Sequence, residues 1–209
     1  DSLGNESVVK EGDVQWTTAG RGIIHAEGPS KGFVKKGGEL EGVQLWLNLP
    51  AAYKMITPSY QHIKSDEMPI ITNDLGNIQL KIVAGKQKDQ IGLINTQTDV
   101  NVFIVKGEQG GVMEIDIPIN HHSTLYLLDG ETIVNDDHKL KKGANQLVVF
   151  NTDGKTIKFK TTKKSKLLIL SGEPINEKIT QYGPYVMNTQ TEILEAMRDF
   201  QQGKMGYLY

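Results

Sequence analysis

The sequence from residue 12 to residue 27 reads G-D-V-Q-W-T-T-A-G-R-G-I-I-H-A-E. If its second half, residues 22–27, is a β-strand, His25 and Glu27 lie on the same face, because side chains alternate along a strand with a period of two. An imidazole and a carboxylate on one face inside a barrel can present two ligands to Fe, Mn, Ni or Zn. We therefore identify His25 and Glu27 as candidate metal ligands. Judged on the two residues alone, an ordinary polar pair is the favoured interpretation.

Short strand-like segments with turn residues between them continue on both sides of this stretch. In residues 42–49 (G-V-Q-L-W-L-N-L) the alternation puts Val43, Leu45, Leu47 and Leu49 on one face. Similar segments follow at residues 78–84, 100–106, 112–117 and 166–170. Strands this dense, punctuated by glycine, predict an all-β sandwich or barrel.

One helix is predicted, near the C-terminus. Thr189 and Glu192 have the spacing of a capping box, apolar residues recur at helical spacing up to Phe200, and Gly203 supplies a stop. We expect the apolar stripe of this helix to pack on a barrel wall. Residues 49–69 contain Pro50, Pro58 and Pro69 and are predicted to be a linker.

Composition excludes several classes of protein. The 209 residues include 38% hydrophobic and 23% charged residues, with a net charge of -2, which is typical of a globular chain and not of a nucleic-acid binder. The lysine-rich residues 155–166 alternate with apolar residues and predict a strand with a solvated outer face. The absence of cysteine excludes disulfides and thiolate metal sites. No apolar run approaches a membrane span, so we expect a cytoplasmic protein, or a nuclear one in a eukaryote.

A partial internal repeat suggests that the first barrel is incomplete. Aligning Gly12 with Gly143 also aligns Gln15 with Gln146. The second copy has a strand-rich segment before it, residues 111–134, whereas the first has little before Gly12. A barrel cannot close without those strands. We therefore expect the chain to begin inside its first domain, with an open edge through which two copies could pair.

Four stretches give the chain a resemblance to the pirin family. Pirins read roughly G-D-V-Q-W-M-T-A-G-x-G-I-x-H-S-E, which is similar to residues 12–27. The others are residues 45–55 (L-W-L-N-L-P-A-A-Y-K-M), 80–85 (L-K-I-V-A-G) and 171–189 (S-G-E-P-I-N-E-K-I-T-Q-Y-G-P-Y-V-M-N-T). The chain departs from the general cupin pattern, with Thr18 in place of proline and His25 two places late, but this departure is what pirins show.

The resemblance implies a fold and a metal site. It implies two double-stranded β-helix (cupin, jelly-roll) domains: the C-terminal part of a first cupin with its linker in residues 1–60, and a second cupin with the terminal helix in residues 61–209. Pirins bind one divalent metal in the first barrel, usually iron, with Mn, Ni, Cu and Zn as alternatives. Three histidines and one glutamate hold it. His25 and Glu27 match the last two ligands, and a His-Pro-His segment upstream of residue 1 would supply the others, so this chain alone is expected to bind metal weakly, if at all.

The resemblance also implies two functions of different classes. One is a quercetin 2,3-dioxygenase-type oxidoreductase acting on a flavonol-like substrate, with Glu27 as ligand and catalytic proton acceptor. This truncated chain would then be inactive. The other is a non-enzymatic, metal- or redox-responsive transcriptional co-regulator that binds protein partners. Neither implies direct contact with nucleic acid or membrane.

The remaining histidines are interpreted as structural. His121 and His122 are adjacent, so on a strand they point to opposite faces and cannot chelate together. The second barrel is accordingly expected to be metal-free. His62 and His138 fall in linker and turn contexts and are expected to be solvated. Trp16 and Trp46 are expected to pack.

Overall fold

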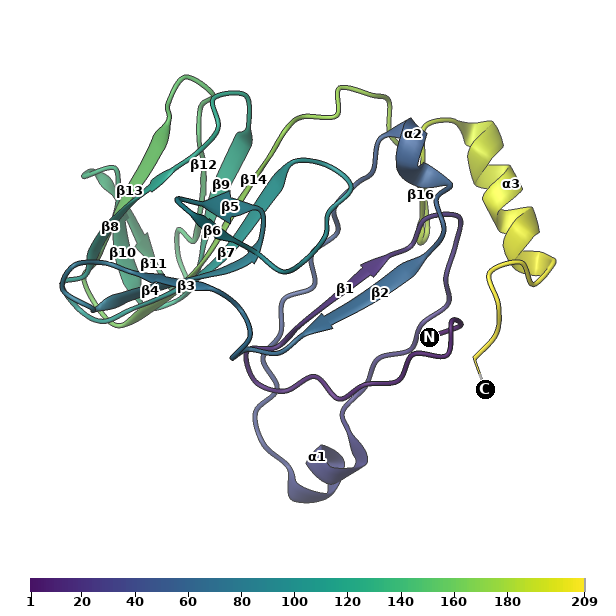
Figure 1. Cartoon of the computed structure of the whole chain (residues 1–209), viewed down its shortest axis with the longest axis horizontal. Coiled ribbons are helices and arrows are strands. Elements are labelled where there is room, and N and C mark those ends of the chain that lie inside the picture. Colours follow the sequence, from purple (N-terminus) through teal and green to yellow (C-terminus); the bar gives the residue numbers. More distant parts are fainter. Residues whose placement is uncertain (209) are drawn as a thin grey trace. The chain divides into compact units, whose positions relative to one another are not determined.

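The computed structural model describes residues 1–208 and divides the chain into two compact units (Figure 1). Unit 1 comprises residues 1–62 and the residues from Ile175 onward, and unit 2 comprises residues 63–174. The segment from Ile175 onward thus groups with residues 1–62 in the structure. The division into cupin domains at residues 60 and 61 stays a prediction.

Unit 2 is built from antiparallel strands in two main sheets. A six-stranded sheet has the order β12-β9-β14-β7-β4-β3, a four-stranded sheet has the order β11-β10-β13-β8, and β5 and β6 form a small hairpin. The strands are β3 (Ile70–Thr72), β4 (Ile78–Ala84), β5 (Lys86–Gln87), β6 (Gln90–Ile91), β7 (Val100–Gly107), β8 (Val112–Asp116), β9 (His122–Asp129), β10 (Glu131–Val134), β11 (His138–Lys141), β12 (Leu147–Val149), β13 (Thr156–Thr161) and β14 (Ser165–Gly172). The two sheets fit the jelly-roll arrangement expected for a cupin, without a closed barrel.

The core of unit 2 lies between these two sheets. On the central strand β14, Ile169 is paired with Phe103 on one side and Leu125 on the other, and all three are fully buried. The opposite sheet contributes Phe159 on β13 to the same apolar cluster. Along β13 buried residues alternate with exposed or half-buried ones such as Lys160, which confirms the predicted strand with a solvated outer face. The alternation predicted for residues 78–84, 100–106, 112–117 and 166–170 likewise falls on β4, β7, β8 and β14.

Unit 1 contains little regular structure. Its elements are β1 (Val14–Thr18), α1 (Lys31–Lys36), α2 (Ala51–Lys54), β2 (Ser59–Ile63, whose last residue belongs to unit 2), β15 (Thr180–Tyr182), β16 (Tyr185–Met187) and α3 (Gln190–Gln201). The strands form two separate two-stranded sheets, β1-β2 and β15-β16. Residues 1–62 therefore form no closed barrel, in agreement with the expectation of an incomplete first barrel in this chain. In the part of the chain that the structure describes, no helix is long and apolar enough to cross a bilayer.

Two predicted strands of unit 1 are not strands. Residues 22–27 and 42–49 have no regular secondary structure. Residues 42–49 pair with no strand among residues 1–208, so neither face is covered, and Val43 and Trp46 are 55% and 60% exposed. The expectation that Trp46 packs is wrong for the same reason, whereas Trp16 on β1 is half-buried.

The predicted linker, residues 49–69, carries structure instead. It contains α2 and β2, and β2 pairs with β1. Lys54 at the end of α2 is buried, and its ammonium group donates to the Asn48 side chain (2.8 Å) and to the Val186 carbonyl (3.2 Å). These bonds tie the segment to the β15-β16 hairpin, which explains why it is ordered despite its three prolines.

The C-terminal helix α3 begins with the predicted capping box. The Thr189 hydroxyl accepts a hydrogen bond from the Glu192 amide (3.3 Å), and the Glu192 carboxylate accepts one from the Thr189 amide (2.8 Å). The helix packs on the β15-β16 hairpin of its own unit and not on a barrel wall, with Ile193 fully buried. The expected packing partner was therefore wrong, because the hairpin beside the helix in sequence supplies its apolar contact.

We expect replacement of Phe159 by alanine to lower the free energy of unfolding of unit 2 by about 3–5 kcal/mol, because a large side chain is removed from a closed core. The matched control is Lys160→Ala, the next residue on β13 but on its outer face, with an expected change within about 0.5 kcal/mol. Urea unfolding followed by hydrogen exchange of the β13 and β14 amides measures both. Equal losses would contradict the placement of Phe159 in the core.

We expect the capping box to make α3 sensitive to acid. Hydrogen bonds, first from the Thr189 hydroxyl, hold the pKa of Glu192 below its usual value of 4.5. Its contribution to stability is therefore present above the unfolded pKa and is lost as the pH falls through the lowered pKa. The stability difference between wild type and Glu192→Gln should be largest near pH 7 and should shrink as the pH falls below 4.5 through the lowered pKa. Urea unfolding followed by far-ultraviolet circular dichroism tests this, and a difference independent of pH would contradict it.

Candidate metal centre

A tight turn after β1 positions the two candidate ligands. Gly20 and Gly22 have φ angles of +50° and +123°, and the Gly22 amide donates to the Ala19 carbonyl (2.9 Å). Only glycine adopts such angles without strain, so the backbone reverses here and residues 23–27 run back alongside β1. Gln15 and Glu27 lie at equal distances in sequence before and after Arg21. The turn therefore brings the side chains of Gln15 and Glu27 together.

The returning segment is held on its other side by the first residues of the chain. The Ser2 amide donates to the Ile24 carbonyl (2.7 Å), and the Ile24 amide donates to the Ser2 hydroxyl (3.0 Å). The same hydroxyl donates to the Met205 carbonyl (2.6 Å). Residues 23–27 thus have a fixed backbone position although they form no strand.

His25 and Glu27 are brought together in the structure. Nδ1 of His25 and Oε1 of Glu27 lie 3.4 Å apart, and the two side chains are 44% and 48% exposed. Two atoms each bound at about 2.1 Å to one metal are about 3 Å apart when their bonds are perpendicular, so the pair fits two ligands of a single cation. The expected inward-facing strand is not present, and both groups are open to solvent. Among residues 1–208, no third His, Asp or Glu joins them in a group suited to a metal.

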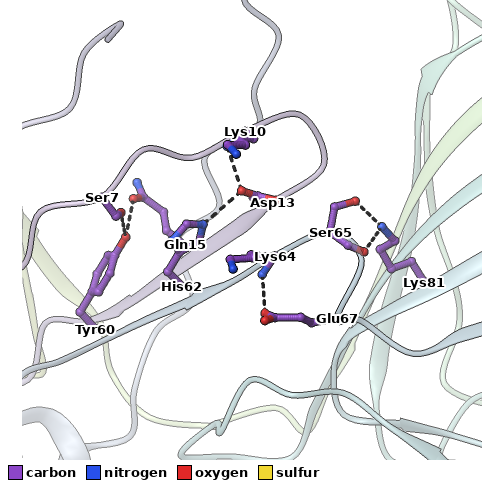
Figure 2. A network of polar contacts seen from close by, with 10 residues as sticks. All are labelled: Ser7, Lys10, Asp13, Gln15, Tyr60, His62, Lys64, Ser65, Glu67 and Lys81. Atoms are coloured by element: carbon purple, nitrogen blue, oxygen red, sulfur yellow. Dashed lines mark hydrogen bonds and ion pairs between the residues drawn. The ribbon is translucent and has the colours of Figure 1, made fainter.

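A hydrogen-bonded chain of polar side chains leads from β1 and β2 to Glu27. The Gln15 side-chain amide on β1 donates to the Glu27 carboxylate. The Tyr60 hydroxyl on β2 donates to the Gln15 side-chain oxygen (3.3 Å) and lies 2.5 Å from the Ser7 hydroxyl. Figure 2 shows the side chains of Ser7 and Gln15 meeting at the Tyr60 hydroxyl. Gln15, which donates to Glu27, is therefore itself held in place by Tyr60.

A second cross-strand contact joins the same two strands. The Asp13 side chain, 6% exposed, accepts a hydrogen bond from the Lys10 amide (2.9 Å) and lies 3.2 Å from Nε2 of His62 (Figure 2). The expectation that His62 is solvated is therefore wrong, because β2 is a strand and places His62 beside a buried carboxylate. The His138 side chain, by contrast, is 63% exposed, with Nε2 3.3 Å from the Asp137 carboxylate.

The spacing of polar residues in the sequence carries part of the information needed to predict this network. Asp13, directly before β1, is two residues from Gln15, and Tyr60 and His62 are two residues apart on β2. In extended backbone residues two apart share a face. What the sequence does not give is the pairing of β1 with β2 across more than forty residues. Without that pairing, Gln15 and Tyr60 have no reason to be considered together.

The adjacent histidines of unit 2 point in opposite directions, as predicted. His122 is exposed, whereas His121 is 4% exposed, with Nδ1 3.2 Å from the Ser171 hydroxyl and Nε2 3.5 Å from the Asp99 carboxylate. The Asn101 side chain donates to the same Ser171 hydroxyl (2.9 Å). His121 is therefore satisfied by its neighbours and makes no pair with His122.

Family comparisons cover both ends of the chain. The pirin model matches residues 1–47, and the model of the pirin C-terminal cupin domain matches residues 94–206. A pirin-like protein of Solanum lycopersicum is 33% identical over 208 residues, which cover 99% of this chain and 69% of that protein. Pirin of Rattus norvegicus is 33% identical over 209 residues, again covering 99% of this chain and 69% of the relative.

A solved structure shows the same fold over the whole chain. The crystal structure of a quercetin 2,3-dioxygenase from Acinetobacter baumannii superposes with a TM-score of 0.93 at 37% identity. The match covers 100% of this chain and 72% of that one. His25, Glu27 and Gln15 all lie in the N-terminal stretch that the pirin model covers.

We expect Asp13→Ala to lower the free energy of unfolding of unit 1 by about 1–3 kcal/mol, because the Lys10 amide and the His62 ring lose the buried carboxylate that they share. Glu11→Ala, an exposed carboxylate two residues earlier, is the matched control and should change stability by less than about 0.5 kcal/mol. Tryptophan fluorescence during urea unfolding is the measurement, since Trp16 and Trp46 both lie in unit 1. A loss no larger than that of the control would show that the contact is not stabilising.

Proposed function

This chain belongs to the pirin family of cupin proteins, and on that basis we propose that it is part of a metal-dependent oxidoreductase of the quercetin 2,3-dioxygenase type. In this proposal His25 and Glu27 are two ligands of one divalent metal. The substrate is a flavonol-like aromatic compound. Family membership implies a divalent-metal site. The metal, the substrate and the roles of the two residues are the parts we propose.

One observation carries the proposal: an imidazole and a carboxylate held 3.4 Å apart in the pirin-matched segment. Imidazole nitrogen and carboxylate oxygen are the donors that Fe, Mn, Ni and Zn accept in proteins. The fixed turn at Gly20 and Gly22 and the Ser2 contacts limit how far the two groups can separate. The similarity to a quercetin 2,3-dioxygenase over the full length of this chain supports the reaction class.

Two ligands alone do not make a strong site, because metal affinity depends on the number and rigidity of the ligands. We propose that two further histidines, in a His-Pro-His segment preceding residue 1, complete it. Iron is the first candidate metal, followed by Mn, Ni, Cu and Zn. A bound divalent metal would supply Lewis-acid polarisation of a substrate oxygen, together with open positions for substrate or O₂.

The protein side chains then have distinct tasks. His25 contributes a neutral ring nitrogen, and Glu27 contributes negative charge. The amide of Gln15 donates to Oε1 of Glu27, the same oxygen that lies 3.4 Å from Nδ1 of His25. A carboxylate oxygen can accept a hydrogen bond and also bind a cation, and Oε2 can take the proton of a flavonol hydroxyl. The partial exposure of both side chains allows a planar aromatic compound to reach them from solvent.

We expect metal and turnover to depend together on His25 and Glu27. The 209-residue chain and a form extended upstream through the His-Pro-His segment should be compared by elemental analysis after loading with Fe²⁺. Both should also be assayed for loss of quercetin absorbance and for O₂ uptake. Stoichiometric metal and turnover are expected in the extended form. His25→Ala and Glu27→Ala should weaken metal binding at least about 10-fold, since each removes a ligand. His138→Ala, an exposed histidine, is the control.

The alternatives give different results in the same assays. Metal binding that depends on His25 and Glu27, without turnover, would contradict the enzyme and favour a metal-responsive regulator that binds protein partners. Metal binding that is unchanged in both variants, or absent from both forms of the protein, would show that His25 and Glu27 are not ligands.

A further inference from the structure

We propose that Gln15 and Tyr60 are positioning residues that orient the Glu27 carboxylate for metal binding. This inference rests on the proposed function, because it assigns Glu27 as a ligand. Neither residue needs to contact metal or substrate. Their effect is exerted through the side chain of Glu27.

The contacts define a direction for every hydrogen bond in the chain of side chains. An ionised carboxylate can only accept, so Gln15 must present its NH₂ group to Glu27. The side-chain oxygen of Gln15 then faces Tyr60, whose hydroxyl donates to it (3.3 Å). The Tyr60 oxygen, 2.5 Å from the Ser7 hydroxyl, is left to accept from Ser7. Each group therefore donates to the next, from Ser7 through Tyr60 and Gln15 to Glu27.

The paired strands β1 and β2 hold Gln15 and Tyr60 in fixed positions. Gln15 is the second residue of β1 and Tyr60 the second residue of β2, and Asp13, directly before β1, contacts His62 on β2. Glu27 itself lies in a segment without regular structure and is about half-exposed. A carboxylate on such a segment would sample several rotamers, and the contact with Gln15 restricts it to those that keep Oε1 at the amide.

Restricting the rotamers of the Glu27 side chain should strengthen metal binding. Groups that hydrogen-bond to a metal ligand fix its orientation, and their loss typically weakens metal affinity by about 10- to 100-fold. A structural role alone, joining β1 to residue 27, would affect folding stability and not metal affinity. The two roles therefore predict different measurements.

The first experiment compares Gln15→Met, which keeps the length of the side chain but removes the amide, and Tyr60→Phe, which removes only the hydroxyl. Gln181→Met and Tyr182→Phe, at exposed positions of β15, are the matched controls. The protein is titrated with Co²⁺, and its visible absorption reports both affinity and ligand geometry. We expect Gln15→Met to weaken Co²⁺ binding by about 10- to 100-fold and Tyr60→Phe to weaken it less. The double variant should resemble Gln15→Met, because Tyr60 acts through Gln15. Co²⁺ affinities and spectra equal to those of the control variants would overturn the proposal. A loss of Co²⁺ affinity that is explained by lower thermal stability of the metal-free variants would also overturn it.

The second experiment needs no metal and separates failure of this inference from failure of the proposed function. The side-chain NH₂ signals of Gln15, assigned by their loss in Gln15→Met, are followed by ¹⁵N nuclear magnetic resonance. They should shift in Glu27→Ala and in Tyr60→Phe but not in Tyr182→Phe. Signals unmoved by Glu27→Ala would overturn the positioning role whatever the metal data. Signals that shift in a protein that binds no Co²⁺ would support the contacts and count against the metal site.

Discussion

The backbone reversal between Ala19 and Gly22 is the constraint on which the candidate site depends. It turns the chain after β1, so that the Glu27 carboxylate meets the Gln15 side chain on β1. A side chain at Gly20 would meet the carbonyl of Ile56, which also accepts the Arg21 amide (3.0 Å). The turn thus needs both a left-handed backbone and close contact with the segment before β2, and only glycine meets both conditions.

The two units are stabilised by different physical means. Unit 2 has an apolar core between two sheets, with strands paired through their full length. Within residues 1–208, Ile193 and Met205 are the only buried apolar side chains that unit 1 contributes, proline aside. Unit 1 depends instead on directed polar contacts: Asp13 with His62, Lys54 with Asn48 and Val186, and the Thr189–Glu192 capping box. Such contacts give little net stability each but fix orientation well, which is what a ligand site requires.

Features that depend on residues close in sequence were predicted correctly from the sequence. Alternation identified β4, β7, β8 and β14, and the Thr189–Glu192 spacing identified the start of α3, because strand faces and helix caps depend on residues close in sequence. The pairing of His25 with Glu27 was predictable from a spacing of two. The lack of a strand at residues 42–49, the partial burial of His62 and the link from Gln15 to Tyr60 were not. Each depends on whether a distant strand is present to pair, and no local pattern carries that information.

The unpaired segment at residues 42–49 also bears on how long the protein survives in a cell. A stretch without regular structure and with exposed Val43 and Trp46 is the kind of backbone that proteases cut. Cleavage there would not require the well-packed unit 2 to unfold.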